Sequence, residues 1–280
     1  MTEITADYAR ALLPARPAVC GKADFGSLLI IAGSTGFSGA AWFAASAAVR
    51  SGVGTVTVGV PESIWNQVAP GVREAMCFPL PCDAEGKLST AAFDLIFGRL
   101  ERCTAVLCGP GMGRGPAPAE LVRLLCLGKK PLILDADGIN NKKGHIINCP
   151  LVLTPHEGEF LRLGGNLSNG REAGAAEFVA KYPCTLVLKG HKTIVASPAR
   201  EMLVNPTGNP GMAKGGSGDV LAGVIGALAA QGLQPHDAAA AGVWVHGMAG
   251  DMCAKEKGFT GMIPSDIVDA LPGAFKLLET

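Results

Sequence analysis

Short apolar runs typical of β-strands recur along this chain, and segments typical of helices separate most of them. Runs that are apolar throughout indicate strands that are buried on both faces of a sheet. Strands are expected at residues 27–32, 55–60, 105–108, 131–134, 151–153 and 185–188, and helices at 40–51, 90–101, 117–127, 158–163 and 171–181. This order predicts an α/β fold, a doubly wound and mostly parallel sheet flanked by helices on both faces.

The last third of the sequence predicts a hairpin followed by three helices. Residues 194–196 and 202–204 flank a Ser-Pro-Ala-Arg turn and are expected to pair at one edge of the sheet. The helices are expected at residues 220–230, 237–254 and 265–271. No repeat and no linker rich in proline and serine interrupts the pattern, so residues 1–280 are expected to form a single domain.

Composition excludes several kinds of partner. Apolar residues make up 48% of the chain and charged residues only 17%, which indicates an extensive core. The 24 basic residues balance the 24 acidic ones, so no basic surface is expected to bind nucleic acid or an anionic membrane. The nine cysteines lack the spacing of a metal or redox motif and are expected to be reduced and mostly buried. A small bound ligand fits this composition better.

The first residues of the chain do not resemble a secretory leader. Glu3, Asp7 and Arg10 stand where a signal peptide would carry a basic segment and then an apolar run. The apolar runs near residues 220–235 and 238–250 are shorter than the ~20 apolar residues that a membrane span needs. We therefore expect a cytoplasmic protein without a membrane partner.

The stretch from Gly208 to Asp219 combines four features that phosphoryl-transfer sites use. It supplies flexible glycine backbone, main-chain donors, the cation of Lys214 and the carboxylate of Asp219, and an apolar helix is expected to follow. A helix N-terminus presents free N–H groups and the positive end of a dipole, which favours an anion there. A glycine-rich helix start without a function would need neither Lys214 nor Asp219, so we interpret the stretch as a nucleotide-using active site.

Two more glycine-rich loops follow expected strands, at residues 32–41 and 108–113. Each has two interpretations, a close approach of backbone to a ligand or a tight turn. Neither is a Walker A loop, because no Gly-Lys-Ser/Thr follows, and Pro116 stands where a dinucleotide fingerprint would need its third glycine. The ends of parallel strands are nevertheless where ligands bind in such sheets.

Acidic residues and a histidine follow two further strands. Asp135, Asp137 and Asn140 are suited to orienting a ribose or a hydrated Mg²⁺, with helix capping as the alternative for Asp137 and Asn140. His156 and Glu159 are expected at the same rim, where ligand contact is favoured over a structural role for the histidine.

The segment from Lys189 to Thr193 follows the last buried strand and carries cations and a hydroxyl. These groups suit a nucleotide phosphate or sugar, and the alternative is a solvated surface loop.

Taken together, these motifs resemble those of the ADP- or ATP-dependent NAD(P)H-hydrate dehydratases, which belong to the ribokinase-like superfamily. The likeness covers residues 25–272 and rests on six motifs in one order: Gly33-Ser34 with Ser38-Gly39-Ala40; Gly109 to Gly113; Asp135-Ala136-Asp137; Thr154-Pro155-His156 with Gly158-Glu159; Lys189-Gly190 with Thr193; and Asn205 to Asn209 with Met212 to Asp219. The resemblance implies that the S epimer of hydrated NADH or NADPH is dehydrated. It also implies that ADP becomes AMP, or that ATP becomes ADP, with release of phosphate.

The resemblance also implies a chemical route. The ring hydroxyl is phosphorylated and then leaves as phosphate, with Asp219 as general base in a Mg²⁺-assisted reaction. A homo-oligomer, commonly a tetramer, is implied as well. Because the separate epimerase domain of some relatives is not expected in this chain, another protein would supply epimerisation.

The implied site residues fall into four groups. The catalytic residue is Asp219; the nucleotide-binding residues are Lys189, Gly190, His191, Lys192, Thr193, Asn209, Lys214, Gly215, Gly216, Ser217 and Gly218; the substrate-binding residues are Ala40, Gly113, His156 and Asp219; and Glu159 is the candidate Mg²⁺ ligand.

The chain departs from the family pattern in two places. Gly21-Lys22-Ala23 stands where relatives often carry His-Lys-Gly, and Ala32 replaces a frequent glycine, both at the rim of the substrate pocket. Two other functions stay open at this point: a kinase for a hydroxymethylpyrimidine or a thiazole alcohol, and a non-catalytic nucleotide sensor. The sequence also does not decide whether the nucleotide is ADP or ATP, or whether the hydrated cofactor is NADH or NADPH.

Overall fold

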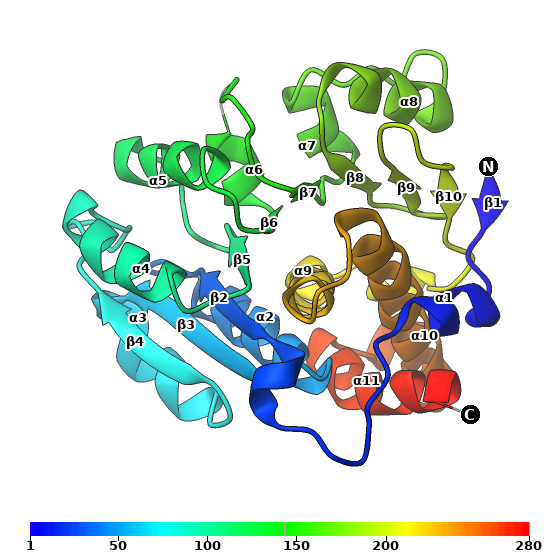
Figure 1. Cartoon of the computed structure of the whole chain (residues 1–280), viewed down its shortest axis with the longest axis horizontal. Coiled ribbons are helices and arrows are strands. Elements are labelled where there is room, and N and C mark those ends of the chain that lie inside the picture. The colour runs from blue at the N-terminus through cyan, green and yellow to red at the C-terminus, as the bar shows by residue number, and fades with distance from the viewer. Residues whose placement is uncertain (143, 280) are drawn as a thin grey trace.

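The computed structural model describes residues 1–142 and 144–279, and one ten-stranded sheet runs through it (Figure 1). The strand order across the sheet is β1-β10-β9-β8-β7-β6-β5-β2-β3-β4. The strands are β1 (Thr2–Glu3), β2 (Ser27–Ile31), β3 (Thr55–Pro61), β4 (Met76–Leu80), β5 (Ala105–Cys108), β6 (Leu132–Leu134), β7 (Leu151–Leu153), β8 (Thr185–Leu188), β9 (Ile194–Ala196) and β10 (Leu203–Val204).

Helices connect most of the strands. They are α1 (Ala6–Leu12), α2 (Ser38–Arg50), α3 (Glu62–Val68), α4 (Phe93–Leu100), α5 (Pro116–Cys126), α6 (Asp137–Asn141), α7 (Glu157–Arg162), α8 (Arg171–Lys181), α9 (Ser217–Ala230), α10 (Pro235–Gly261) and α11 (Pro264–Glu279), with short 3₁₀ turns η1 (Lys22–Phe25), η2 (Ala69–Gly71), η3 (Thr90–Ala92) and η4 (Pro210–Met212). None of the described helices is long and apolar enough to cross a membrane.

The sheet is parallel except around β9, which runs antiparallel to both β8 and β10. From β2 the chain winds outward through β3 to β4, and from β5 it winds the other way through β6 and β7 to β8. The winding therefore reverses between β2 and β5, as in doubly wound sheets, and ligands bind beyond the strand ends at such a point. The predicted fold class is confirmed.

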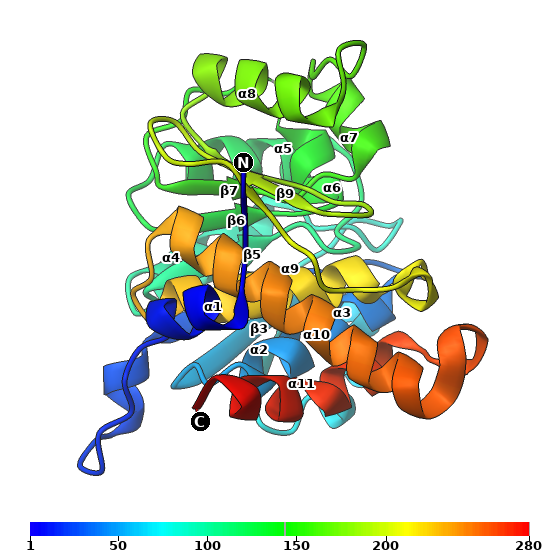
Figure 2. The same cartoon turned by 90° about the vertical axis from the view of Figure 1, so that its right-hand side faces the viewer.

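Two hydrophobic clusters cover the two faces of the sheet, and alternate residues of each strand feed them. Leu28 and Ile30 of β2 belong to the cluster with α1, α2, α3, α9, α10 and α11, whereas Leu29 and Ile31 belong to the cluster with α4, α5, α6, α7 and α8. Figure 2 shows the sheet between these two helix layers. This is why the strand sequences are apolar without interruption.

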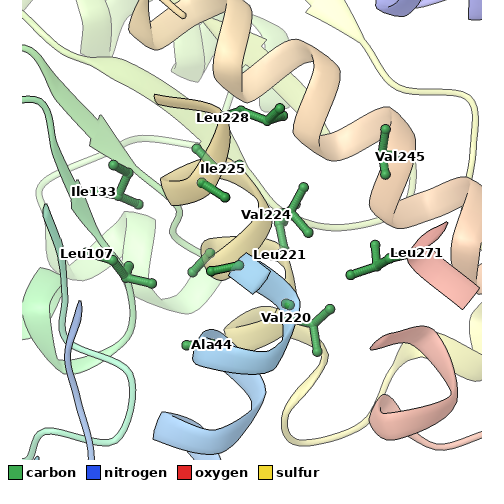
Figure 3. Packing of buried hydrophobic residues seen from close by; sticks show 14 of the residues in the cluster. Ala44, Leu107, Ile133, Val220, Leu221, Val224, Ile225, Leu228, Val245 and Leu271 are labelled. Carbon is green, nitrogen blue, oxygen red and sulfur yellow. The ribbon is translucent and has the colours of Figure 1, made fainter. Parts of the chain in front are cut away.

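Helix α9 lies at the centre of the first cluster and packs directly against α2 (Figure 3). Val220, Val224 and Ile225 are completely buried among neighbours from β5, β6, α2, α10 and α11. A methyl group on Gly223 would collide with the backbone oxygen of Ala44 in α2. The small residues of α9 thus allow backbone contact between the helices and fix the axis along which the first turn of α9 is presented.

The structure differs from the sequence prediction mainly at the edges of the sheet. Strands β1 and β4 and helices α1 and α3 were not predicted, and β10 is not an edge strand because β1 pairs with it in parallel. The predicted hairpin itself forms, from β9 and β10. All nine cysteines are free, and six of them are buried.

Candidate active site

The glycine-rich loop leads into the first turn of α9, where Asp219 lies. Gly216 takes a left-handed conformation (φ 103°) immediately before the helix begins at Ser217, a conformation that glycine adopts at little cost. No acceptor among the described residues meets the N–H groups of Gly218 and Asp219. The start of α9 therefore presents free donors and the positive end of a helix dipole beside the Asp219 carboxyl group.

One ammonium group and three carboxyl groups meet beside this turn. Lys189 Nζ lies 2.8 Å from Asp135 Oδ1 and 4.0 Å from Glu159 Oε2. A methyl group on Gly218 would lie 3.2 Å from Lys189 Nζ, so the ammonium group reaches the first turn of α9. Asp219 is near enough to interact electrostatically with Asp135, Lys189 and Glu159. The ends of β6, β7 and β8 thus bring their charged residues to the start of α9.

Asp135 is the most deeply buried of these carboxyl groups, at 1% exposed. Its Oδ1 accepts a hydrogen bond from Thr154 Oγ1 at 2.6 Å and another from Lys189 Nζ at 2.8 Å. Burial of a charge is tolerated when partners of this kind replace water. Asp135 and Thr154 together hold the Lys189 ammonium group in place.

The environment of Asp219 raises the pKa of its carboxyl group to about 7. Burial is the largest cause, the negative charges of Asp135 and then Glu159 add to it, and the charge of Lys189 opposes it. For Lys189 itself, burial acts to lower the pKa, but Asp135, Glu159 and Asp219 outweigh that effect and raise it. At neutral pH the site therefore holds a permanent cation and a carboxyl group poised to gain or lose a proton.

His156 and Glu159 form a reciprocal cap at the start of α7. His156 Nδ1 accepts from the N–H groups of Gly158 (3.0 Å) and Glu159 (3.3 Å), and Glu159 Oε2 accepts from the His156 N–H at 2.9 Å. Because Nδ1 is an acceptor, the neutral ring carries its proton on Nε2. The side chain of His156 is 56% exposed. The residue therefore has a structural role in addition to an accessible ring.

The loop after β2 is bonded to the loop after β5. Gly33 N donates to Pro110 O at 2.7 Å, and Ser34 Oγ donates to Gly111 O at 2.8 Å. A methyl group on Gly111 would lie 2.9 Å from Ala40 Cβ, so Ala40 abuts this glycine loop. The two glycine loops thus form one wall at the point where the winding of the sheet reverses.

Asp137 and Asn140 are used to hold that wall. Asp137 Oδ2 accepts from Gly113 N at 3.0 Å, and its Oδ1 accepts from Asn140 Nδ2 at 3.2 Å and from Arg114 Nε at 3.3 Å. Asn141 donates to Gly113 O at 2.9 Å. Neither Asp137 nor Asn140 caps α6, whose N-cap is Ala136 without a side-chain bond. Among the acidic residues after β6, Asp135 is the one that meets Lys189.

Arg171, which the sequence analysis did not identify, holds the loop from Lys189 to Thr193. Its guanidinium group donates to the carbonyl groups of Leu188 (2.9 Å), Lys189 (3.2 Å), His191 (2.6 Å) and Lys192 (3.3 Å). Within the loop, Thr193 Oγ1 donates to Gly190 O at 3.0 Å, and the side chains of His191 and Lys192 are exposed. Nothing in the local sequence marks Arg171, because its partners lie about twenty positions away.

Two polar side chains of the glycine loop are directed away from the first turn of α9. Lys214 Nζ donates to the carbonyl groups of Thr260 (2.7 Å) and Met262 at the end of α10. Asn209 accepts from Gly211 N at 3.0 Å and donates to Asp251 Oδ1 at 2.9 Å. In this structure both side chains fasten the loop to α10.

Two buried polar atoms near the start of α9 have no hydrogen-bond partner in the described part of the chain, Ser217 Oγ and His246 Nε2. Burial lowers the pKa of His246 to about 4, against a smaller raising effect from the Ser217 backbone, so the ring is neutral at neutral pH. A buried hydroxyl without a partner is costly. An anion at the start of α9 would supply an acceptor for Ser217 Oγ.

The chemistry of these carboxyl groups fits Mg²⁺. No group of three or more His, Cys, Asp and Glu side chains among residues 1–142 and 144–279 is arranged as a complete metal site. Mg²⁺ does not require one, since it commonly binds one or two carboxylates together with waters and substrate phosphates. Asp135, Glu159 and Asp219 share the ammonium group of Lys189. Among the described residues, no donor meets Oε1 of Glu159.

The charged residues beside the start of α9 line neither of two hollows near the amino ends of the strands, whereas Lys22, which was expected at the rim of the substrate pocket, lines one of them. One of these, of about 560 Å³, is bordered by Lys22, Ser27, Thr55, Arg99 and Thr104, near the amino ends of β2, β3 and β5. The candidate site is therefore defined by convergent polar groups at the carboxyl ends of the strands, where doubly wound sheets bind ligands.

A doubly wound sheet, an anion-binding helix start and a carboxyl group with a pKa near 7 beside it define a nucleotide-using enzyme of the ribokinase-like class. A solved structure of a ribokinase-like superfamily protein from Enterococcus faecalis matches with a TM-score of 0.87 and 28% identity, over 99% of this chain and 96% of that one. A family model described as NAD(P)H-hydrate dehydratase matches residues 28–273. The chain belongs to the NAD(P)H-hydrate dehydratase family.

Two relatives show the range of this family. A solved structure of an ADP/ATP-dependent NAD(P)H-hydrate dehydratase from Bacillus subtilis, co-crystallised with ATP and Mg²⁺, has a TM-score of 0.85 and 30% identity over 99% of this chain and 98% of that one. A bifunctional NAD(P)H-hydrate repair enzyme from Moorella thermoacetica is 41% identical over 99% of this chain but only 54% of its own length. The chain thus spans about half the length of the bifunctional relatives it matches.

Proposed function

We propose that this chain dehydrates the S epimer of hydrated NADH or NADPH and spends the terminal phosphoryl group of ADP or ATP to do so. The observation that carries the proposal is the position of Asp219. Its carboxyl group, with a pKa of about 7, stands beside free N–H groups and within reach of the Lys189 ammonium group. Membership of the NAD(P)H-hydrate dehydratase family supports the substrate class.

In the first step Asp219 accepts the proton of the ring hydroxyl. The hydroxyl oxygen attacks the terminal phosphorus of the nucleotide, and the bond from that phosphorus to the leaving AMP or ADP breaks. The N–H groups at the start of α9 and the Ser217 hydroxyl would hold the charge of the transferring group, and Lys189 would add a fixed positive charge. On the core side of this turn water is kept out, because Val220 is completely buried.

In the second step the phosphate ester breaks. The ring nitrogen supplies the electrons that expel phosphate, a far better leaving group than hydroxide, and the neighbouring ring carbon loses a proton. The products are NADH or NADPH, AMP or ADP, and inorganic phosphate. Asp219 then returns the hydroxyl proton to solvent, which a pKa of about 7 permits at neutral pH.

The remaining residues are assigned by their place around Asp219. We assign the loop from Lys189 to Thr193 to the nucleotide, and Ala40, Gly113 and His156 to the hydrated cofactor. The neutral His156 ring would donate from Nε2, since its Nδ1 caps α7. We assign Asn209 and Lys214 an indirect role in nucleotide binding, because both fasten the glycine loop to α10.

Glu159 is the proposed Mg²⁺ ligand, with Asp135 nearby. Mg²⁺ would neutralise charge on the nucleotide phosphates when it is bound. Glu159 is suited to this because it is 5% exposed and lies in the same carboxyl cluster as Asp219.

Four wider aspects of the proposal concern the whole protein. We propose that residues 1–280 act as one domain and that the protein works as a homo-oligomer, namely a tetramer. We also propose that it is cytoplasmic and that a separate epimerase cooperates with it. The single sheet that runs from β1 to β4 supports the assignment of one domain. Size-exclusion chromatography with light scattering measures the oligomeric state.

The decisive experiment supplies hydrated NADH, Mg²⁺ and either ADP or ATP in separate reactions. The expected result is recovery of NADH absorbance, with one phosphate released for each NADH formed. A small-molecule kinase would instead accumulate a phosphorylated alcohol, and a nucleotide sensor would bind nucleotide without turnover. Either of those results would contradict the proposal.

The matched variant is Asp219→Asn. Loss of the general base should lower turnover by about 10²- to 10⁴-fold, while calorimetric titration should still detect nucleotide binding. Unchanged turnover in this variant would show that Asp219 is not the base.

A further inference from the structure

The loop from Asn205 to Lys214 is attached along its length to a single helix, α10. Its polar side chains bond to backbone carbonyl groups of that helix and the residue after it. The bonds are Asn205 Nδ2 to Val243 O (2.9 Å), Thr207 Oγ1 to Trp244 O (3.0 Å), and Lys214 Nζ to Thr260 O (2.7 Å) and to Met262 O. The loop that precedes Asp219 is therefore shaped on α10.

Small residues let the helix backbone approach the loop. A methyl group on Gly247 would collide with Thr207 Oγ1, and one on Gly250 would collide with the Met212 side chain. Residues 243, 247, 250 and 251 are spaced by three and four positions and so lie on one face of α10. Along this face the loop contacts backbone carbonyl groups and glycines first, and then the carboxylate of Asp251.

Asp251 holds the point where the loop turns toward the active site. Its Oδ2 accepts from Gly208 N, and its Oδ1 accepts from Asn209 Nδ2, both at 2.9 Å. Asn209 Oδ1 in turn accepts from Gly211 N at 3.0 Å, and Gly208 takes a left-handed conformation (φ 105°). Both carboxylate oxygens are thus used by donors of the loop.

Backbone hydrogen bonds between residues close in sequence continue from this point to the start of α9. Lys214 N donates to Met212 O at 2.8 Å, and Ser217 N donates to Lys214 O at 3.3 Å. On the same helix as Asp251, His246 contacts the backbone of Ser217. A shift of Gly208 or Asn209 would therefore move the N–H groups of the first turn of α9.

We propose that Asp251 is a positioning residue for phosphoryl transfer, one that acts through Gly208 and Asn209 on the free N–H groups at the start of α9. The inference rests on the proposed function, because it assigns a role within the same reaction. Asp251 touches neither substrate nor nucleotide in this scheme. Its effect should fall on the chemical step, since small displacements of reacting groups cost rate more than binding.

The test compares Asp251→Asn with Asp237→Asn. Both aspartates lie on α10, but Asp237 forms a surface ion pair with Arg200 instead of contacting the loop. Asp251→Asn places an amide donor against a loop donor, so we expect kcat to fall at least about tenfold. The KM for hydrated NADH should change less than about threefold, because this substrate does not depend on the loop for binding. Asp237→Asn should keep the wild-type kcat.

A double variant separates positioning from a general loss of stability. In Asn209→Asp with Asp251→Asn, the new aspartate can accept from Gly211 N and from the new asparagine, whose oxygen can accept from Gly208 N. All three hydrogen bonds are then restored, and only the one between the side chains at positions 209 and 251 has its donor and acceptor exchanged. We expect the double variant to regain most of the lost kcat.

The outcomes are distinct. The inference would be overturned if Asp251→Asn and Asp237→Asn had equal kcat, or if the double variant were no faster than Asp251→Asn. In either case, turnover by the wild-type protein would leave the proposed function intact. An inactive wild type in the same assay would refute the proposed function, and the inference with it. Melting temperatures of all variants are measured in parallel, and a loss of kcat that merely follows a loss of folded protein would also overturn it.

Discussion

At the scale of single residues, the site depends on how three carboxyl groups share one ammonium group. Lys189 pairs most closely with Asp135, which leaves Asp219 in a buried and negative environment. That arrangement makes Asp219 a stronger base than an ordinary aspartate. The same arrangement makes its charged form costly to bury.

We expect turnover to fall as the pH drops through about 7. The proposed reaction needs Asp219 without its proton, and its pKa is raised from 3.8 to about 7, so the active form is lost on the acid side. The measurement is kcat/KM for hydrated NADH from pH 5 to pH 9. Full activity down to pH 5 would contradict the assignment of Asp219 as base.

Asp219→Asn should also stabilise the protein at alkaline pH. The folded pKa of Asp219 lies above the unfolded value, so ionisation destabilises the fold progressively as pH rises from about 4 to about 7 and fully above that. A neutral amide removes this cost, which is on the order of 4 kcal/mol. Urea unfolding at pH 8 should show the gain, and unfolding near pH 4 should show it nearly gone. An equal gain at both pH values would point to another cause.

Sequence reasoning located the residues that carry charge at strand ends but only some of those that hold them. Asp219, Lys189 and Glu159 follow visible glycine loops and strands, so each was named in advance, and the structure places them together. Asp251 was missed because its partners are more than 40 positions away. The signal that would have found it is a lone carboxylate closing an uncharged, glycine-rich stretch of α10.

At the scale of elements, α9 matters because it is a helix of small residues packed on the backbone of α2. Its length was predicted to within one turn, since an apolar run after glycines is a clear signal. Strand β4 was missed because Pro79 lies within it. Proline is tolerated there since β4 is the last strand of the sheet and one of its sides needs no partner.

Gly223→Ala should destabilise the protein by about 2 kcal/mol, because the added methyl group meets the Ala44 backbone oxygen. The control is Gly98→Ala in α4, where nothing lies within 4 Å of the added group. That change should be neutral or stabilising by up to about 1 kcal/mol. Urea unfolding of both variants measures the difference, and similar effects would show that α9 and α2 are less closely packed than described.

At the scale of the whole molecule, the site gathers residues from both halves of the sheet. Ala40 follows β2 on one side of the reversal, and Asp135, Glu159 and Lys189 follow β6, β7 and β8 on the other. The class of fold and this general location followed from the strand and helix order. The pairing of β1 with β10 did not, because two residues carry no recognisable strand pattern.

Nucleotide should therefore stabilise the entire fold. A ligand that binds only the native state at about 100 times its dissociation constant adds about 2.7 kcal/mol. We expect ADP with Mg²⁺ to raise the melting temperature by several degrees, and removal of Mg²⁺ with EDTA to reduce the increase. Guanosine at the same concentration, which lacks phosphate, is the control, and an equal increase with it would contradict binding through phosphate.

The attachment of the glycine loop to α10 has a consequence for protein engineering. The twelve residues from Gly208 to Asp219 look like a portable motif in the sequence, yet their shape is set by carbonyl groups, glycines and a carboxylate some 40 positions later. Transplanting the loop alone into another α/β protein would transfer its amino-acid sequence without its conformation. The smallest unit that can be moved is the loop together with the helix on which it is built.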